Sequence, residues 1–181
     1  TSEKTAAVPP VADTDTTAPK LEEAAKTDKV LFYSDFDGTD SEQLDVQGPA
    51  VIGSGNLAMA RDGYLNLGTD MLKGQKNVTI EMVIKPSEIV EHAGIMGLGT
   101  NEDQNWWLIG MRGKGALKFG MRTGDQGEAG GDQPTKDEVL KVGEWTTVKY
   151  VITETSVTAY ANGELLKTWD VTGQKSIGEI N

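Results

Sequence analysis

From Lys29 onward the chain consists of short apolar runs separated by glycine, asparagine and aspartate. The clearest run lies within 77–85, where Val78, Ile80, Met82 and Ile84 occupy every second position. A period of two places these side chains on one face of a β-strand, whereas a helix would scatter them around its circumference. The same pattern predicts strands at 30–34, 57–60, 64–67, 78–84, 95–98, 106–111, 117–122, 145–152, 156–161 and 164–169.

Two turns indicate how the last three strands pair. Asn162-Gly163 separates VTAYA from ELLKTW, and these two residue types readily adopt the positive φ angles of a type I′ hairpin turn. Glu154-Thr155 separates the strands on either side of it in the same way. We therefore expect a three-stranded antiparallel meander. In contrast, 123–136 (TGDQGEAGGDQPTK) has no strand pattern and is expected to be a long mobile loop.

The first 28 residues differ in composition from the rest. They contain Pro9, Pro10 and Pro19 among threonine, alanine and charged residues, and they lack any aromatic residue. Such a segment buries too little apolar surface to offset its chain entropy. The sequence therefore predicts a flexible or extended arm over 1–28 and an all-β domain over 29–181.

Charge and composition narrow the classes of ligand. The formal net charge is −11 and the isoelectric point is about 4.5, so phosphate backbones would be repelled. The absence of cysteine excludes disulfides and thiolate metal sites, and no apolar run has membrane-spanning length. The composition does not exclude Ca²⁺ binding, because Ca²⁺ is bound by oxygen atoms, which acidic side chains supply. Its candidate ligands are Asp35, Asp37 and Asp40, which are otherwise solvated turn residues.

The string VLFYSDFDGTD resembles the nucleophile motif of haloacid-dehalogenase-like phosphohydrolases, which would make Asp35 the nucleophile and Asp37 the acid/base. That fold needs a parallel sheet with crossover helices, and no helical pattern of useful length follows. Glycoside hydrolysis needs two paired carboxylates, but Glu81 is the one acid inside a strong strand pattern. His92 has no nucleophile beside it and is expected at the surface. The sequence therefore favours a protein that is not an enzyme.

Tryptophans are the best candidates for ligand contact, since sugar rings stack on flat aromatic faces. Trp106 and Trp107 are adjacent on one predicted strand, so their side chains point to opposite faces. Either one could be the core residue, depending on the register. Trp169 ends its strand and is expected to be partly exposed. Our candidate ligand-binding residues are therefore Trp106, Trp107 and Trp169.

Six segments, taken in order, resemble laminin-G-like domains of the concanavalin A-like lectin/glucanase superfamily. They are LFYSDFDGTD, DGYLNLGTD, NVTIEMVIKPSE, GIMGLGTNEDQNWWLIGMR, LKFGMRTG and VGEWTTVKYVITETSVTAYANGELLKTW. The resemblance implies a jelly-roll β-sandwich of two antiparallel sheets, used for carbohydrate or protein recognition. It also implies one more strand after SIGEIN, paired beside 30–34.

The expected function is thus a non-catalytic recognition or adhesion module, extracellular or at the cell surface, that binds a glycan or another cell-surface ligand. The alternative is a structural subunit of an extracellular filament or surface layer, joined by strand exchange. In that case the missing strand would come from a neighbouring subunit, and the assembly segment would be Val30, Leu31, Phe32 and Tyr33. A truncated or compact sandwich, or an arm that folds back into the gap, would also account for the missing strand. A glycoside hydrolase or lyase is the distant third reading.

Overall fold

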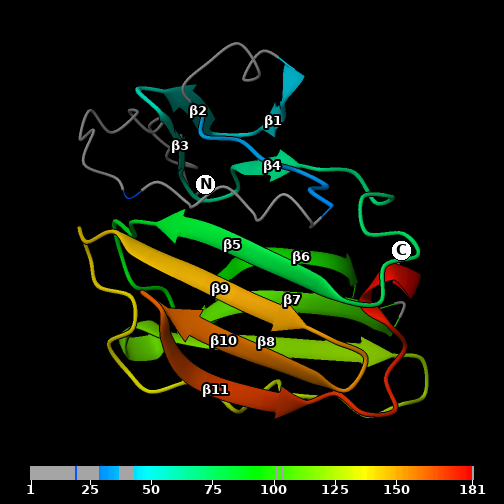
Figure 1. The fold of residues 1–181 in the computed structure, drawn as a ribbon. Coiled ribbons are helices and arrows are strands. Elements are labelled where there is room, and N and C mark those ends of the chain that lie inside the picture. The colour runs from blue at the N-terminus through cyan, green and yellow to red at the C-terminus, as the bar shows by residue number, and fades with distance from the viewer. Residues whose placement is uncertain (1–18, 20–28, 37–42, 101, 103, 181) are drawn as a thin grey trace, which may run out of the picture. The chain divides into compact units, whose positions relative to one another are not determined.

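The computed structural model describes residues 19, 29–36, 43–100, 102 and 104–180 (Figure 1). The chain divides into two compact units, 1–71 and 72–181, which are described here one at a time. This division falls between Met71 and Leu72. The arm proposed for 1–28 lies almost wholly outside the described residues, so that boundary stays a prediction.

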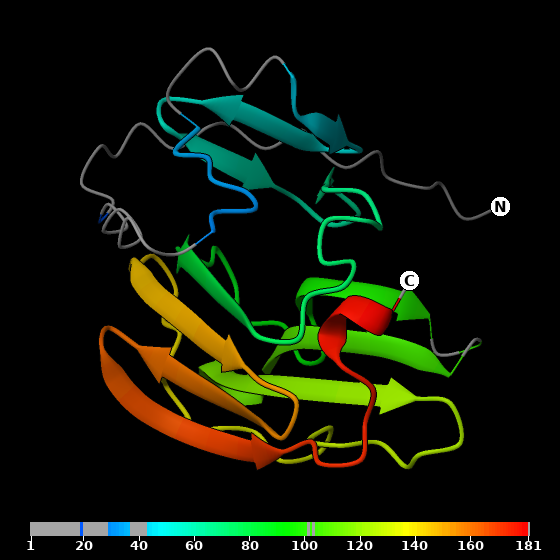
Figure 2. The same ribbon diagram turned by 45° about the vertical axis from the view of Figure 1, so that its right-hand side comes forward.

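Unit 72–181 is built from two antiparallel sheets that form the layers of a β-sandwich (Figures 1 and 2). One sheet has the strand order β11-β10-β9-β5, and the other has the order β6-β7-β8. The strands are β5 (Val78–Ile84), β6 (Gly94–Thr100), β7 (Asn105–Arg112), β8 (Ala116–Thr123), β9 (Thr146–Ile152), β10 (Ser156–Ala161) and β11 (Glu164–Asp170). Two short 3-10 turns, η2 (Gly113–Gly115) and η3 (Ile177–Glu179), complete the unit. The all-β antiparallel prediction is confirmed.

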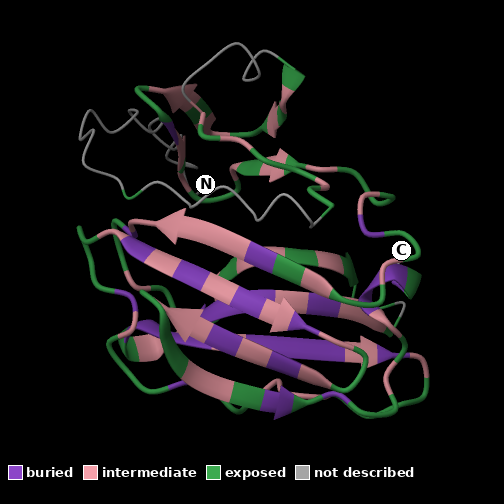
Figure 3. Ribbon diagram, viewed as in Figure 1, coloured by how far each residue is buried: buried purple, intermediate pink, exposed green. Residues whose placement is uncertain are grey.

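The core lies between the two sheets and follows the period of two. In β9 every second residue is buried, which Figure 3 shows as alternating bands. Three aromatic rings join the layers: Phe119 of β8 lies 6.4 Å from Tyr150 of β9 and 6.2 Å from Trp169 of β11, measured between ring centroids. Tyr150 and Trp169 stack at 6.1 Å. Each fully buried large side chain of this kind contributes about 1.5–3 kcal/mol to the sandwich.

The described residues of unit 1–71 form four short strands in two pairs. The hairpin β2 (Ala50–Gly53) to β3 (Asn56–Met59) forms one pair, and β1 (Asp45–Gln47) with β4 (Tyr64–Asn66) forms the other. The strand expected at 30–34 was wrong, since this segment has no strand conformation. Its exposed apolar side chains are Val30 (57%), Phe32 and Tyr33 (54%), whereas Leu31 is half-buried. A strand needs a ladder partner for its backbone groups, and among the described residues this segment pairs with none.

Turn chemistry was read correctly at the end of the chain. Asn162 and Gly163 both have positive φ, 48° and 81°, and they join β10 to β11 as expected for a type I′ turn. The strands β9, β10 and β11 form the expected meander.

The segment after β8 differs from the expected mobile loop. Ala129 exchanges both backbone hydrogen bonds with Met121, at 3.0 and 2.8 Å, and Thr135 N–H donates to Leu117 O at 2.8 Å. The segment therefore runs along the outer edge of β8 and covers backbone groups that would otherwise be unpaired. It carries few apolar side chains, so its attachment comes from main-chain hydrogen bonds, which a hydrophobic pattern does not reveal. Among the described residues, no helix is long and apolar enough to cross a membrane.

Candidate functional site

The pairing register of β6, β7 and β8 decides which tryptophan faces away from the core and can contact a ligand. Trp107 stands opposite Leu98 and Met121 on the core face of its sheet and is only 2% exposed. Trp169 is also 2% exposed, and its indole N–H donates to Gln133 O at 2.6 Å. Neither ring presents a face to solvent, so the ligand contacts expected of these two side chains are not available. Trp106 points the other way and is half-buried.

Trp106 belongs to the side of the β6-β7-β8 sheet that faces away from the core, called the outer face below. Directly paired residues of antiparallel strands share a face, so the ladder gives its members. They are Gly94, Gly97, Gly99, Trp106, Leu108, Gly110, Arg112, Ala116, Lys118, Gly120 and Arg122. The strands thus contribute three cations, one tryptophan and five glycines to this face, and no acidic residue.

The glycines of the outer face have no side chains, so side chains of neighbouring residues can lie across them. A β-carbon at Gly120 would lie 3.0 and 3.1 Å from two carbons of the six-membered ring of Trp106. A β-carbon at Gly97 would lie 3.1 Å from a methyl carbon of Leu108. The indole therefore rests against the backbone at Gly120 instead of standing away from the sheet. An aromatic side chain held in this way is pre-positioned, which lowers the entropy cost of using it for binding.

Polar groups surround this indole. Arg122 is the direct cross-strand partner of Trp106, and its Nη2 donates to Gln104 Oε1 at 3.3 Å. A carboxylate oxygen of Glu128 lies 3.5 Å from the position of a β-carbon at Gly120, beside the ring. Donors and an acceptor thus sit around one aromatic side chain, as is typical of polar ligand sites.

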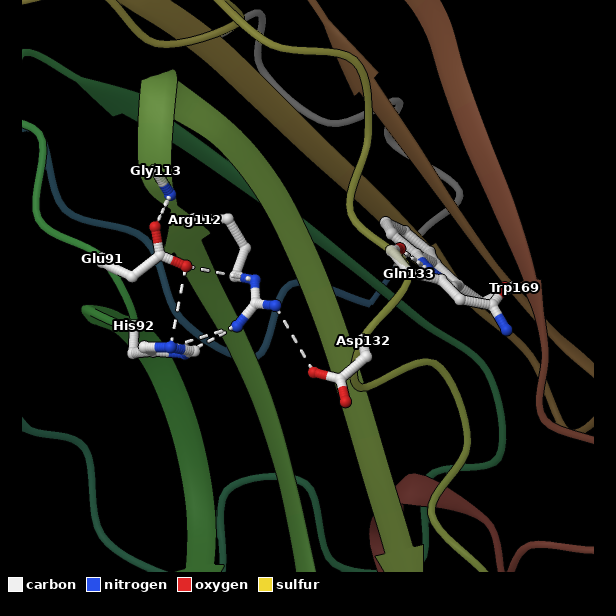
Figure 4. A network of polar contacts seen from close by, with 7 residues as sticks. All are labelled: Glu91, His92, Arg112, Gly113, Asp132, Gln133 and Trp169. Atoms are coloured by element: carbon white, nitrogen blue, oxygen red, sulfur yellow. Dashed lines mark hydrogen bonds and ion pairs between the residues drawn. The ribbon is translucent and has the colours of Figure 1, made fainter.

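The opposite end of the outer face carries a charged network centred on Arg112 (Figure 4). Its guanidinium reaches Glu91 at 3.5 Å, Asp132 at 3.4 Å and the Nδ1 atom of His92 at 2.7 Å. Because a guanidinium only donates, the imidazole nitrogen that faces it must accept. Glu91 also accepts a hydrogen bond from Gly113 N at 2.5 Å. The charge of Arg112 is therefore already balanced, and the network holds the loop at 91–92 and the segment at 132 to β7.

Beside this network lies a shallow pocket of about 360 Å³. Its lining includes Arg112, Glu91, Lys114 and Asp137, and the last two form an ion pair of 3.5 Å. The opposed charges are paired with each other, so the pocket offers no uncompensated charge to a ligand. The surface around Trp106 is therefore a better candidate than this pocket.

Comparison with known families matches residues 59–179 to a laminin-G model of the concanavalin A-like lectin/glucanases superfamily. The chain belongs to this superfamily. The match covers all seven strands of the sandwich, and it confirms the resemblance seen in the sequence. A comparison with curated proteins gave no match.

Membership in the concanavalin A-like superfamily fixes the fold and leaves the chemistry to the site, because the superfamily includes both lectins and glucanases. Glu81, the acid considered for hydrolysis, lies on the other sheet and forms an ion pair with Lys149 at 3.3 Å. Glycoside hydrolysis needs two carboxylates about 5–9.5 Å apart on either side of the scissile bond. On the outer face, the strands supply no acid at all, and Glu128 is contributed by the neighbouring segment.

The expected calcium ligands are only partly visible. Asp35 is exposed, while Asp37 and Asp40 lie outside the described residues. Within the part of the chain that the structure describes, no three residues of the types Asp, Glu, His or Cys are grouped so that they could hold a metal ion. Calcium binding at these aspartates therefore stays a prediction.

Sequence reasoning missed Lys118, Gly120, Arg122 and Glu128 as parts of a candidate site. The signal that could have found the first three is the stretch 105–123, which contains four basic residues and no acidic one in a strongly acidic chain. Glu128 had no such signal, because its place beside Trp106 depends on how the segment after β8 is fastened.

Proposed function

We propose that this protein is a non-catalytic recognition module that binds carbohydrate on the outer face of the β6-β7-β8 sheet, in an extracellular or cell-surface setting. The observation that carries the proposal is the position of Trp106, whose indole lies across Gly120 on a low, glycine-rich surface. The apolar face of a sugar ring stacks on an aromatic ring of this kind.

The polar neighbours of Trp106 suit the hydroxyl groups of a sugar. Arg122 and Gln104 supply N–H donors on one side of the indole, and Glu128 supplies an acceptor on another. Sugar hydroxyls both donate and accept, so a mixed set of this kind can fix the orientation of a ring that stacking alone would leave free to rotate. The strands of this face contribute no acid, and hydrolysis needs a pair of carboxylates, so these strands support binding.

The test is a comparison of Trp106→Ala with Trp145→Ala by isothermal titration against a panel of soluble polysaccharides. Trp145 is the matched control because it is also half-buried but stands next to Lys85, whose Nζ lies 5.2 Å from its ring centroid, away from the outer face. We expect Trp106→Ala to weaken binding about tenfold, as for a central aromatic contact. Trp145→Ala should leave the affinity unchanged. Equal affinities for wild type and Trp106→Ala would contradict the proposal.

Assembly by strand exchange is the second candidate, and one observation favours it. Val30, Phe32 and Tyr33 are exposed apolar residues in a segment that pairs with no described strand. Such a segment is suited to adding a strand to the sheet of another copy. Light scattering over a range of protein concentrations tests this. A mass that rises with concentration, and that Phe32→Asp returns to that of a monomer, would support assembly, whereas a monomer at every concentration would exclude it.

A further inference from the structure

The charge of the outer face is opposite in sign to that of the chain. The whole protein carries a net charge of −11, whereas the strands of this face contribute Arg112, Lys118 and Arg122 and no acid. Arg112 is balanced by Glu91 and Asp132. The other two cations form no ion pair with any described carboxylate, and the partner seen for Arg122 is the neutral amide of Gln104.

These two cations flank the indole. Lys118, Gly120 and Arg122 occupy alternate positions of β8 and so share the outer face, with Gly120 in the middle. Because the ring of Trp106 lies over Gly120, it stands between the two charges along the strand. At about 3.4 Å per residue, the backbone positions of the cations are roughly 14 Å apart. Their long side chains can therefore reach groups on either end of a sugar unit placed on the ring.

We propose that this surface selects anionic polysaccharides, with a sugar ring on Trp106 and its carboxylate or sulfate group held by Arg122 or Lys118. The inference rests on the carbohydrate-binding function proposed above and names the class of ligand. Half-buried cations that pair with no described carboxylate are partly desolvated already, so an anion that meets them recovers more interaction than it would from fully solvated side chains. Neutral polysaccharides would gain only the stacking and hydroxyl contacts.

The negative charge of Glu128 provides a test of whether the ligand is anionic. Its carboxylate lies beside the same glycine as the indole and would repel an anionic sugar there. We therefore expect Glu128→Gln to tighten binding of an anionic polysaccharide about two- to fivefold, and to leave a neutral one unchanged or weaker. A purely structural role for Glu128 would not produce a gain limited to charged ligands.

The main experiment titrates the full chain with two matched pairs of polymers. Polygalacturonate is compared with its methyl ester, which removes the charge from the same backbone, and dextran sulfate is compared with dextran. We expect the charged member of at least one pair to bind more tightly, with an advantage that shrinks as salt rises from 0.05 to about 0.5 M. The pair that shows the advantage distinguishes a carboxylate from a sulfate ligand.

Variants assign the effect to the site. Arg122→Gln and Lys118→Gln should each weaken binding of the charged polymer about two- to fivefold. Lys149→Gln is the matched control, because it makes the same change of charge on the other sheet, where Lys149 pairs with Glu81, and should have no effect.

The outcomes separate the inference from the proposed function. Equal, Trp106-dependent binding of charged and neutral polymers would overturn the charge selectivity and keep carbohydrate binding. Absence of binding to every polymer would overturn both. Binding to oligothymidylate as tight as to the charged polysaccharide would also overturn the inference, because the surface would then select anionic chains that offer stacking rings of any kind.

Discussion

Alanine substitutions at Gly115 and Gly143 form a matched pair that tests how closely the segment after β8 packs against the turn between β7 and β8. Both have φ = +76°, so alanine is disfavoured by the same left-handed backbone at each position. Their surroundings differ. A β-carbon at Gly143 would have no atom within 4 Å, whereas one at Gly115 would lie 2.0 Å from the carbonyl oxygen of Leu140. Any difference in stability between Gly115→Ala and Gly143→Ala therefore measures this close approach.

The expected difference follows from what must move. A carbon and a carbonyl oxygen need about 3.3 Å, so the backbone at Leu140 would shift by about 1 Å or more. The shift would break the hydrogen bond from Leu140 N–H to Gly115 O, now 2.8 Å, which contributes about 1 kcal/mol. It would also displace the Leu140 side chain, which is 1% exposed and whose full burial is worth about 1.5–3 kcal/mol. We expect Gly115→Ala to lose about 2–4 kcal/mol more than Gly143→Ala, which should lose about 1 kcal/mol.

Urea unfolding followed by tryptophan fluorescence provides the measurement. All four tryptophans lie in unit 72–181, so the signal reports on the sandwich. The free energy of unfolding of each variant is compared with that of the wild type at equal slope with urea. Equal losses for the two variants would refute the reasoning, since the segment near Leu140 would then not be seated against the turn between β7 and β8.

Three further predictions concern titration and turn geometry. Burial raises the pKa of Tyr150, so the unfolded chain loses this proton first. The free energy of unfolding should therefore fall as pH rises above about 10. Urea unfolding of Tyr150→Phe at the same pH values should show a smaller fall, because this tyrosine no longer titrates. Hydrogen bonds from the side chain and backbone of Ser176 lower the pKa of Glu179. The stabilisation is present above the ordinary carboxyl pKa and is lost as pH falls through the lowered one, and Ser176→Ala should raise the Glu179 pKa in an NMR titration. Asn162 has positive φ and its side chain accepts from Thr147 N–H at 2.9 Å, so Asn162→Ala should cost about 1–2 kcal/mol in thermal or urea unfolding. Asn162→Gly should cost less, because glycine keeps the backbone conformation and loses only the hydrogen bond.

The strands of the sandwich could be read from the sequence because local pattern and packing agree there. The predicted 78–84 and 156–161 coincide with β5 and β10. Each has apolar residues at alternate positions, which is the pattern of a strand with one face toward the core. In β10 the buried residues Val157 and Ala159 follow this period, and in β5 Ile80 is the buried one. The same pattern failed at 30–34, because an apolar run shows only that a segment could form a strand. Whether it does depends on a partner elsewhere in the chain.

The site was harder to predict, because the pairing register of strands distant in sequence decides which residues lie together. Trp106 and Trp107 have the same local sequence environment, and the choice between them depends on the facing residues Arg122 and Met121. Pairing of distant strands sets those partners, and a shift of one residue would exchange the two tryptophans between the core and the outer face. Trp169 was misassigned for a related reason. Its indole N–H finds a partner at Gln133, in a segment that the sequence showed only as a loop.

Gly120 is better explained by the outer face than by the fold, because the atoms nearest to a β-carbon there belong to the ring of Trp106. Glycine weakens a strand interior, and five of them on one face would be costly if they served only to complete the ladder. A β-carbon at Gly97, Gly99 or Gly110 would meet a backbone carbonyl oxygen within 3 Å, so the fold itself requires glycine there. At Gly120 a β-carbon would instead meet the ring of Trp106 and push it away from the sheet. Gly120 therefore lets the indole lie close to β8, between the positions of Lys118 and Arg122. If the surface had no ligand, Gly120→Ala would only lower the stability of the sandwich through poorer packing. If the proposed function is right, alanine there should weaken polysaccharide binding even where the sandwich remains folded.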